Sequence, residues 1–225
     1  EHDDFAVRTS GLPGIGLLGV TFGYLVAMDS PSGRNDGDYH WGTTLWHEMA
    51  HVFTLEATAH LVPRWFSEGV SVFEEWSTGP LPGRHIPMHV LQAIQEDKLL
   101  PIEDLDSGFI RPTYEGQIMV SYMQAGLICQ YIDERWGQQG LVSVLNLYRD
   151  GLTTAEVVQP ALGMSPAEFD RGFHEFIERE LGPTMAGLED WQDQIRAGAE
   201  ALNEEDWEDA VAAARIMRDT ANALS

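Results

Sequence analysis

The first forty residues alternate short apolar runs with turn-forming segments. Two apolar runs, at 14–20 and 22–28, are bounded by Gly- and Pro-containing turns at 11–14 and 29–33. Short apolar runs between turn formers are typical of β-strands. The pattern therefore predicts a small β-sheet at the front of the chain.

From about residue 43 the apolar positions recur with the spacing of an α-helix. Thr43 or Thr44 is placed to cap a helix that continues to a loop at 60–63. Pro63 favours the start of a second helix, which ends before the Gly- and Pro-rich segment 79–83.

Helices are expected to dominate the rest of the chain. We predict them at about 86–98, 115–136, 138–150, 153–160 and 166–181, with Gly137 as a C-cap. Gly182-Pro183 is the expected domain boundary, followed by an acidic helical segment. The predicted fold class is α+β, with one domain at 1–182 and a helical one at 183–225.

The chain of 225 residues is strongly acidic, with 13 Lys and Arg, 36 Asp and Glu, and a formal net charge of −23. Nucleic acids and anionic membrane surfaces are polyanions, so this balance argues against either as the main partner. No apolar run approaches the roughly 20 residues that a membrane-spanning helix needs.

Cys129 is the only cysteine, which excludes an internal disulfide and a cysteine-rich zinc site but leaves the compartment open. The sequence begins at Glu1, with neither a start methionine nor a signal peptide. We interpret it as an excised or mature form. An exported or cell-envelope protein, with its signal segment absent from this sequence, fits that interpretation.

The segment His47-Glu48-Met49-Ala50-His51 places two histidines four residues apart in a predicted helix. Positions i and i+4 share one helical face, so both imidazoles can bind one tetrahedral metal ion. Glu48 lies beside them, where it can accept a proton from a metal-activated water molecule. The alternative is an amphipathic helix with two histidines and a solvated glutamate.

Such a site needs a third protein ligand, and Glu68 follows His51 after sixteen intervening residues. That spacing lets the first helix end, the chain turn at 62–63, and about one turn of the return helix form. Gly69 leaves room for close helix packing beside the ligand. We expect His47, His51 and Glu68 to bind one metal ion. Two imidazoles, one carboxylate and an open position favour Zn²⁺.

Two further acidic residues, Glu74 and Glu75, follow Glu68 by six and seven positions. We interpret them as a solvated helix face. The alternative is that one of them orients a ligand histidine.

The two metal helices resemble those of a known peptidase family. HEMAH at 47–51 followed by PRWFSEG at 63–69 is similar to the gluzincin zinc metallopeptidases of the bacterial peptidase MA-like group. The resemblance covers roughly 5–182 and implies a small sheet with a mainly helical, thermolysin- or aminopeptidase-like catalytic domain. It also implies hydrolysis of a peptide or protein substrate, with Glu48 as general base.

The segment 122–126, continuing to Tyr131, resembles the tyrosine-bearing helix of that family. In these relatives the tyrosine hydrogen-bonds the oxyanion that forms as water attacks the carbonyl, so the resemblance implies this role for Tyr122. Tyr114, at the start of the same predicted helix, is the competing candidate. An ordinary half-buried tyrosine is the alternative for either residue.

The apolar segment 19–28 is a candidate for the edge strand that gluzincins offer to an extended peptide. A plain core strand is an equally good interpretation. The Gly-Ala-Met-Glu-Asn motif by which aminopeptidases hold a free amino terminus is absent from the sequence, which argues against an aminopeptidase.

The C-terminal residues 191–224 span 34 positions, the period of a tetratricopeptide repeat. Gly198, Trp207 and Ala210 occupy its small, aromatic and alanine positions. A lone repeat cannot bury its own face, so we expect it to pack on the catalytic domain or on further repeats and to offer a surface to a protein partner. The alternative is a generic acidic helical hairpin.

Three functions therefore compete. The leading hypothesis is a zinc metallopeptidase that cleaves peptide bonds with metal-activated water. The second is a peptidase-like scaffold that binds partners through its tetratricopeptide-like helices with little or no turnover. The third is a hydrolase with a non-peptide substrate.

Overall fold

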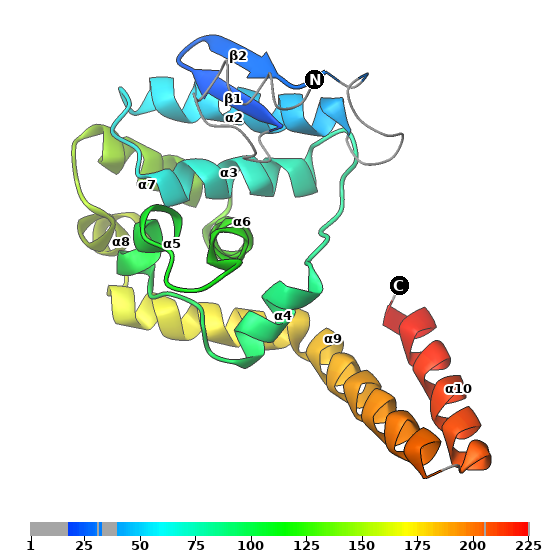
Figure 1. Ribbon diagram of the computed structural model, residues 1–225. Helices are drawn as coiled ribbons and strands as arrows, with labels where there is room; N and C mark the ends of the chain where they lie inside the picture. Colours follow the sequence, from blue (N-terminus) through cyan, green and yellow to red (C-terminus); the bar gives the residue numbers. More distant parts are fainter. Residues whose placement is uncertain (1–17, 31, 33–39, 205, 225) are drawn as a thin grey trace. The chain divides into compact units, whose positions relative to one another are not determined.

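A computed structural model describes residues 18–30, 32, 40–204 and 206–224 of the chain. Within these residues one β-hairpin precedes a series of helices (Figure 1). The elements are β1 Gly19–Phe22, β2 Leu25–Met28, α2 Trp41–Ala57, α3 Arg64–Ser77, α4 Met88–Gln95, the 3₁₀ helix η2 Ile102–Asp104, α5 Leu105–Ile110, α6 Gln117–Trp136, α7 Gln138–Arg149, α8 Thr154–Leu162, α9 Pro166–Asn203 and α10 Trp207–Leu224. The fold is mainly helical with a small antiparallel sheet, consistent with the predicted α+β class.

The hairpin differs in its limits from the two predicted strands. β1 and β2 pair antiparallel, with Phe22 opposite Leu25. The turn between them contains Gly23, whose φ of +59° suits a residue without a side chain. Phe22 therefore ends the first strand, and its predicted place at the start of the second was wrong. Residues 14–17 of the first predicted strand lie outside the described part of the chain.

Helix α2 begins three or four residues earlier than predicted, and neither Thr43 nor Thr44 is its N-cap. His40 is the N-cap, and its Nδ1 accepts a hydrogen bond from the backbone N–H of Thr43 at 3.1 Å. An imidazole nitrogen can thus replace the usual hydroxyl or carboxylate acceptor at a helix N-terminus.

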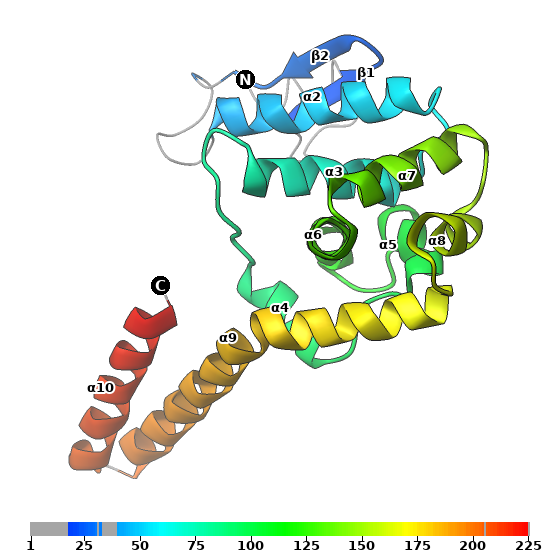
Figure 2. The same cartoon turned by 180° about the vertical axis from the view of Figure 1, so that it is seen from behind.

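Helix α3 lies between α2 and α6 and packs on both, as Figures 1 and 2 show from opposite sides. Two glycines allow α3 and α6 to approach closely. A Cβ at Gly69 would lie 2.7 Å from the carbonyl oxygen of Ala125, and one at Gly126 would lie 2.6 Å from Cγ1 of Val72. The predicted close packing beside Glu68 is thereby confirmed.

Several other helix limits follow from local chemistry. Gly137 ends α6 with a φ of +68°, as predicted. Thr153 and Glu156 form a capping box at the start of α8. Helix α8 continues through Pro160, where its end was predicted. Helices η2 and α5 were not predicted, because each is shorter than the roughly 10 residues that make helical periodicity recognisable.

The chain divides into two compact units, of which the first ends at Arg171 and the second begins at Gly172. Within the second unit α9 continues through Gly182 and Pro183, so the predicted helix end at 181 was wrong. A proline inside a helix removes one backbone hydrogen bond and bends the axis without ending the helix of necessity. Helix α10 runs back beside the last turns of α9 (Figures 1 and 2).

Among the described residues, no helix combines the length and the apolar character that crossing a bilayer requires.

Candidate metal centre

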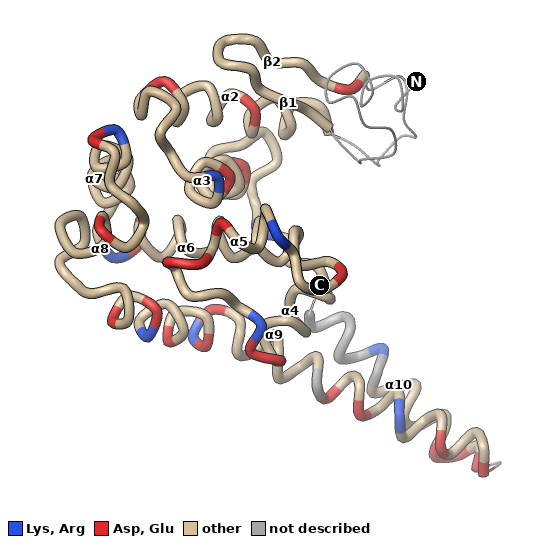
Figure 3. Tube along the Cα trace, turned by 60° about the vertical axis from the view of Figure 1, so that its left-hand side comes forward, with Lys and Arg blue, Asp and Glu red and all other residues tan. Residues whose placement is uncertain are grey.

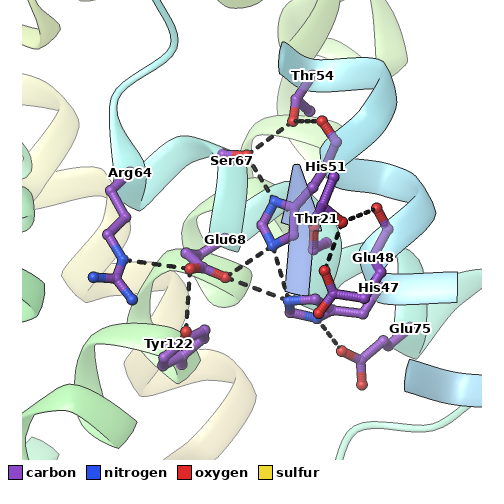
Figure 4. Close-up of polar contacts among 11 residues, drawn as sticks. Thr21, His47, Glu48, His51, Thr54, Arg64, Ser67, Glu68, Glu75 and Tyr122 are labelled. Atoms are coloured by element: carbon purple, nitrogen blue, oxygen red, sulfur yellow. Dashed lines mark hydrogen bonds and ion pairs between the residues drawn. The ribbon is translucent and has the colours of Figure 1, made fainter. Parts of the chain in front are cut away.

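Helices α2 and α3 bring three potential ligand atoms together (Figure 4). The Nε2 atoms of His47 and His51 lie 3.1 Å apart. Oε2 of Glu68 lies 3.3 Å from Nε2 of His47 and 3.2 Å from Nε2 of His51. The i, i+4 spacing on α2 and the position of Glu68 on α3 thus produce one convergent group.

The three separations fit a metal ion. Ligand atoms at about 2.0–2.1 Å from a tetrahedral metal lie about 3.3 Å from one another. All three observed distances, 3.1, 3.2 and 3.3 Å, are close to that value. In the described part of the chain, no other group of three or more His, Cys, Asp or Glu side chains converges in this way.

The second ring nitrogen of each histidine also has a partner. Nδ1 of His47 contacts a carboxylate oxygen of Glu75 on α3. Nδ1 of His51 lies 2.8 Å from Oγ of Ser67 and 3.3 Å from Oγ of Ser71. Such contacts fix the orientation of each ring and direct its Nε2 toward Oε2 of Glu68. Glu75 is therefore not simply part of a solvated helix face.

The two oxygens of Glu68 have different surroundings. Oε2 faces both histidines, while Oε1 accepts a hydrogen bond from the Tyr122 hydroxyl at 3.1 Å. Nε of Arg64 lies 3.4 Å from the same Oε1. The Glu68 side chain is only 10% exposed, so these contacts account for much of its polar environment.

The charges of this cluster shift its pKa values. Burial lowers the pKa of His47, but hydrogen bonds to Glu68 and Glu75 and their negative charges outweigh burial and raise it to about 10. Burial raises the pKa of Glu68, but hydrogen bonds and charge from His47 and His51 outweigh burial and hold it well below its usual range. The two carboxylates thus favour the protonated, positively charged form of His47.

Strand β1 holds the Glu48 side chain. Oγ1 of Thr21 lies 2.6 Å from Oε2 of Glu48 and 2.9 Å from its backbone oxygen. A Cβ at Gly19 would lie 2.7 Å from Oε1 of Glu48, so the strand passes against the carboxylate. Glu48 is buried, and its carboxylate is placed beside the histidines by the strand as well as by α2.

An open cleft of about 390 Å³ contains the three potential ligands. Its walls come from β1, α2, α3 and α6. Arg64 is the only Lys or Arg side chain that lines it among the described residues. Leu55 and Val62 provide apolar surface near the loop between α2 and α3.

The structure separates the two candidate tyrosines. Tyr122 lies on α6 with its hydroxyl at Glu68 and its ring centroid 6.5 Å from that of His47. Tyr114 packs instead on a cluster of Val90, Ala93 and Val120. Its hydroxyl oxygen is buried and has no hydrogen-bond partner among the described residues.

Sequence reasoning missed several residues at this site. Thr21 is 27 positions from Glu48, and no local pattern relates a hairpin to a helix at that distance. Arg64 precedes Glu68 by one helical turn, a spacing that does suggest contact. Glu75 was not missed, because contact of Glu74 or Glu75 with a histidine was the alternative to a solvated helix face, and the contact of Glu75 with His47 supports that alternative.

The HExxH helix, the neighbouring glutamate-bearing helix and the cleft between them define a helical protein with a potential His₂Glu metal site. Residues 32–179 match the family model of the Peptidase MA superfamily, and the chain belongs to that superfamily. Membership indicates a peptidase and implies a peptide or protein substrate. No curated protein and no solved structure matches the chain.

Proposed function

We propose that this protein is a zinc-dependent peptidase of the gluzincin type, with a thermolysin- or aminopeptidase-like catalytic domain at 1–182. The observation that supports the proposal most directly is the near-equal spacing of the three donor atoms of His47, His51 and Glu68. Two imidazoles and one carboxylate beside an open cleft favour Zn²⁺ over ions that prefer oxygen ligands alone.

In this proposal each residue has a separate task. His47, His51 and Glu68 hold the ion, which when bound supplies a Lewis acid that polarises a carbonyl and lowers the pKa of a water molecule. Glu48 accepts the proton of the attacking water and later passes it to the nitrogen of the leaving amine. Thr21 holds the carboxylate of Glu48 in place for both transfers.

Tyr122 is the proposed hydrogen-bond donor to the carbonyl oxygen as negative charge develops on it. Burial and the charge of Glu68 raise the pKa of Tyr122 above its ordinary value, against the opposing effect of Arg64. The phenol therefore keeps its proton at neutral pH and is able to donate. Its position beside Glu68 supports this role over Tyr114.

An extended substrate is proposed to lie along β1. Gly19, Val20 and Thr21 line the cleft, and within the described residues β1 pairs with β2 on one edge only. The other edge can add a peptide backbone as a further strand.

The C-terminal helices support a further proposal, that 183–225 contains a first tetratricopeptide-like repeat. Trp207 begins α10 and its side chain is exposed, whereas Ala210 and Ala213 are buried. A small residue on the inner face and an aromatic residue on the outer face suit packing with a further helix or a protein partner.

The test of the catalytic proposal is Glu48→Gln, because it removes the base and no metal ligand. We expect near wild-type zinc content and a loss of hydrolysis of about 100-fold or more, assayed on a library of quenched fluorescent peptides. The matched control is Glu74→Gln. Glu74 accepts a hydrogen bond from Thr78, the C-cap of α3, and its variant should cleave peptides like the wild type. Unchanged hydrolysis in zinc-loaded Glu48→Gln would contradict the proposed mechanism.

A further inference from the structure

The Glu68 carboxylate makes an asymmetric set of contacts. One oxygen, Oε2, lies at 3.2 and 3.3 Å from the two histidine Nε2 atoms. The other, Oε1, receives the Tyr122 hydroxyl at 3.1 Å and lies 3.4 Å from Nε of Arg64 (Figure 4). Each oxygen of the Glu68 carboxylate thus faces a different set of groups.

The two donors come from separate elements and share a support. Tyr122 lies on α6, and Arg64 begins α3. The ring of Phe109 on α5 meets the Tyr122 ring edge-on at 5.1 Å between centroids. The Arg64 guanidinium carbon lies 5.4 Å from the centroid of the same Phe109 ring. This shared contact with Phe109 restricts where the two donors can move.

We propose that Tyr122 and Arg64 are positioning residues that keep Glu68 a one-oxygen ligand through Oε2. This inference rests on the metal site of the proposed function. A carboxylate can bind a metal through one oxygen or both, and binding through both would occupy space that a catalytic site leaves open. Donors held against Oε1 must be broken away before that oxygen can turn toward the metal.

Two donors are needed because the tyrosine hydroxyl has a single hydrogen. If Tyr122 donates to a substrate carbonyl, it releases Oε1 of Glu68 at that moment. Arg64 does not lose its contact, and its ionised guanidinium makes a charge-assisted interaction with the carboxylate. Arg64 then holds Glu68 in its one-oxygen arrangement while Tyr122 acts elsewhere.

The test measures metal coordination, not turnover. We titrate metal-free protein with Co²⁺ and, against a competing chelator, with Zn²⁺. The proteins compared are the wild type, Tyr122→Phe, Arg64→Met and the double variant. Tyr122→Phe retains the ring contact with Phe109, and Arg64 is half exposed, so both variants should fold. Tyr114→Phe removes a tyrosine hydroxyl away from the cleft and is the matched control.

We expect each single variant to raise the metal dissociation constant about 10–100-fold, with the largest rise in the double variant. The visible absorption of bound Co²⁺ should weaken, because a second carboxylate oxygen raises the coordination number above four. Tyr114→Phe should match the wild type in both measurements.

Two contrary results can be distinguished from each other. Wild-type affinity and Co²⁺ spectrum in both single variants and the double variant would overturn the positioning role. That result would leave Tyr122 with a task on the substrate alone. Failure of the wild-type protein to bind either ion would instead refute the metal site of the proposed function, and with it this inference.

Discussion

The two histidines of the candidate metal site differ in the side chains that contact their second ring nitrogen. His47 contacts the carboxylate of Glu75, whereas His51 faces the hydroxyls of Ser67 and Ser71. A carboxylate partner increases the basicity of an imidazole ligand more than a neutral hydroxyl does. We therefore expect metal binding through His47 to depend more strongly on Glu75 than metal binding through His51 depends on the two serines.

The substitution Glu75→Gln tests this difference. It keeps the size of the side chain and removes the charge next to His47. The dissociation constant for Zn²⁺ should rise about 10–100-fold in a chelator competition. Glu74→Gln alters the neighbouring residue, which bonds Thr78, and should bind Zn²⁺ like the wild type. Equal affinities in the two variants would refute the role of Glu75.

The raised pKa of His47 gives metal binding a pH dependence. In the metal-free protein this imidazole is protonated up to about pH 10, and only its neutral form can bind a metal. Binding near pH 7.5 should therefore release about one proton from His47, and affinity should rise about tenfold per pH unit. Calorimetry in two buffers of different ionisation enthalpy measures the release. Binding without proton release would contradict this account.

The same shift affects the stability of the metal-free protein. A pKa raised in the folded state, here from 6.5 to about 10 for His47, favours folding when the imidazole is protonated. That contribution is fully present below pH 6.5 and is lost as the pH rises through about 10.

Thr21 gives a test of how Glu48 is positioned. Thr21→Val keeps the shape of the side chain and removes the hydroxyl that bonds Glu48. We expect kcat to fall about 10–100-fold, because a displaced base transfers protons poorly, with KM and zinc content near wild-type values. Thr21→Ser should restore kcat. A Thr21→Ser variant as slow as Thr21→Val would show that packing, not the hydroxyl, matters here.

At the scale of elements, the crossing of α3 and α6 places Glu68 beside Tyr122. Gly69 lies at that crossing, where any Cβ would meet the carbonyl oxygen of Ala125 at 2.7 Å. Gly69→Ala should lower the free energy of unfolding by about 1–3 kcal/mol, because backbone must move to admit a methyl group. Thermal and denaturant unfolding measure the loss.

Gly182 provides the comparison, because it is also helical and a Cβ there would meet nothing within 4 Å beyond its chain neighbours and the backbone of its own helix. The Cβ of Gly182→Ala would be crowded only by the ring of the following Pro183, so this variant should lose less stability than Gly69→Ala, whose Cβ meets backbone of another helix. A Gly69→Ala protein as stable as Gly182→Ala would contradict the close-packing argument.

Element by element, local patterns predicted the most regular features. Periodicity predicted α2, α3 and α6, and the i, i+4 spacing placed His47 and His51 on one face. Local patterns did not predict features that depend on long-range contacts or on unusual residues. His40 caps α2 with a ring nitrogen, and α9 passes through Pro183. Thr21 reaches Glu48 only because the hairpin packs on α2, which no local pattern encodes.

At the scale of the whole chain, acidic positions far outnumber basic ones along the described helices (Figure 3), in keeping with the net charge of −23. Much of the second unit lies outside the residues that match the Peptidase MA superfamily, 32–179. The catalytic proposal therefore concerns the first unit, where β1, α2, α3 and α6 supply the cleft. The tetratricopeptide-like interpretation concerns the second unit and is independent of it.

The central claim is that His47, His51 and Glu68 form one zinc site, and metal content tests it most directly. Elemental mass spectrometry of the purified protein should find close to one zinc per chain, falling steeply in Glu68→Ala, because two imidazoles alone hold the ion weakly. Wild-type protein without zinc after reconstitution, or Glu68→Ala with undiminished zinc, would contradict the claim.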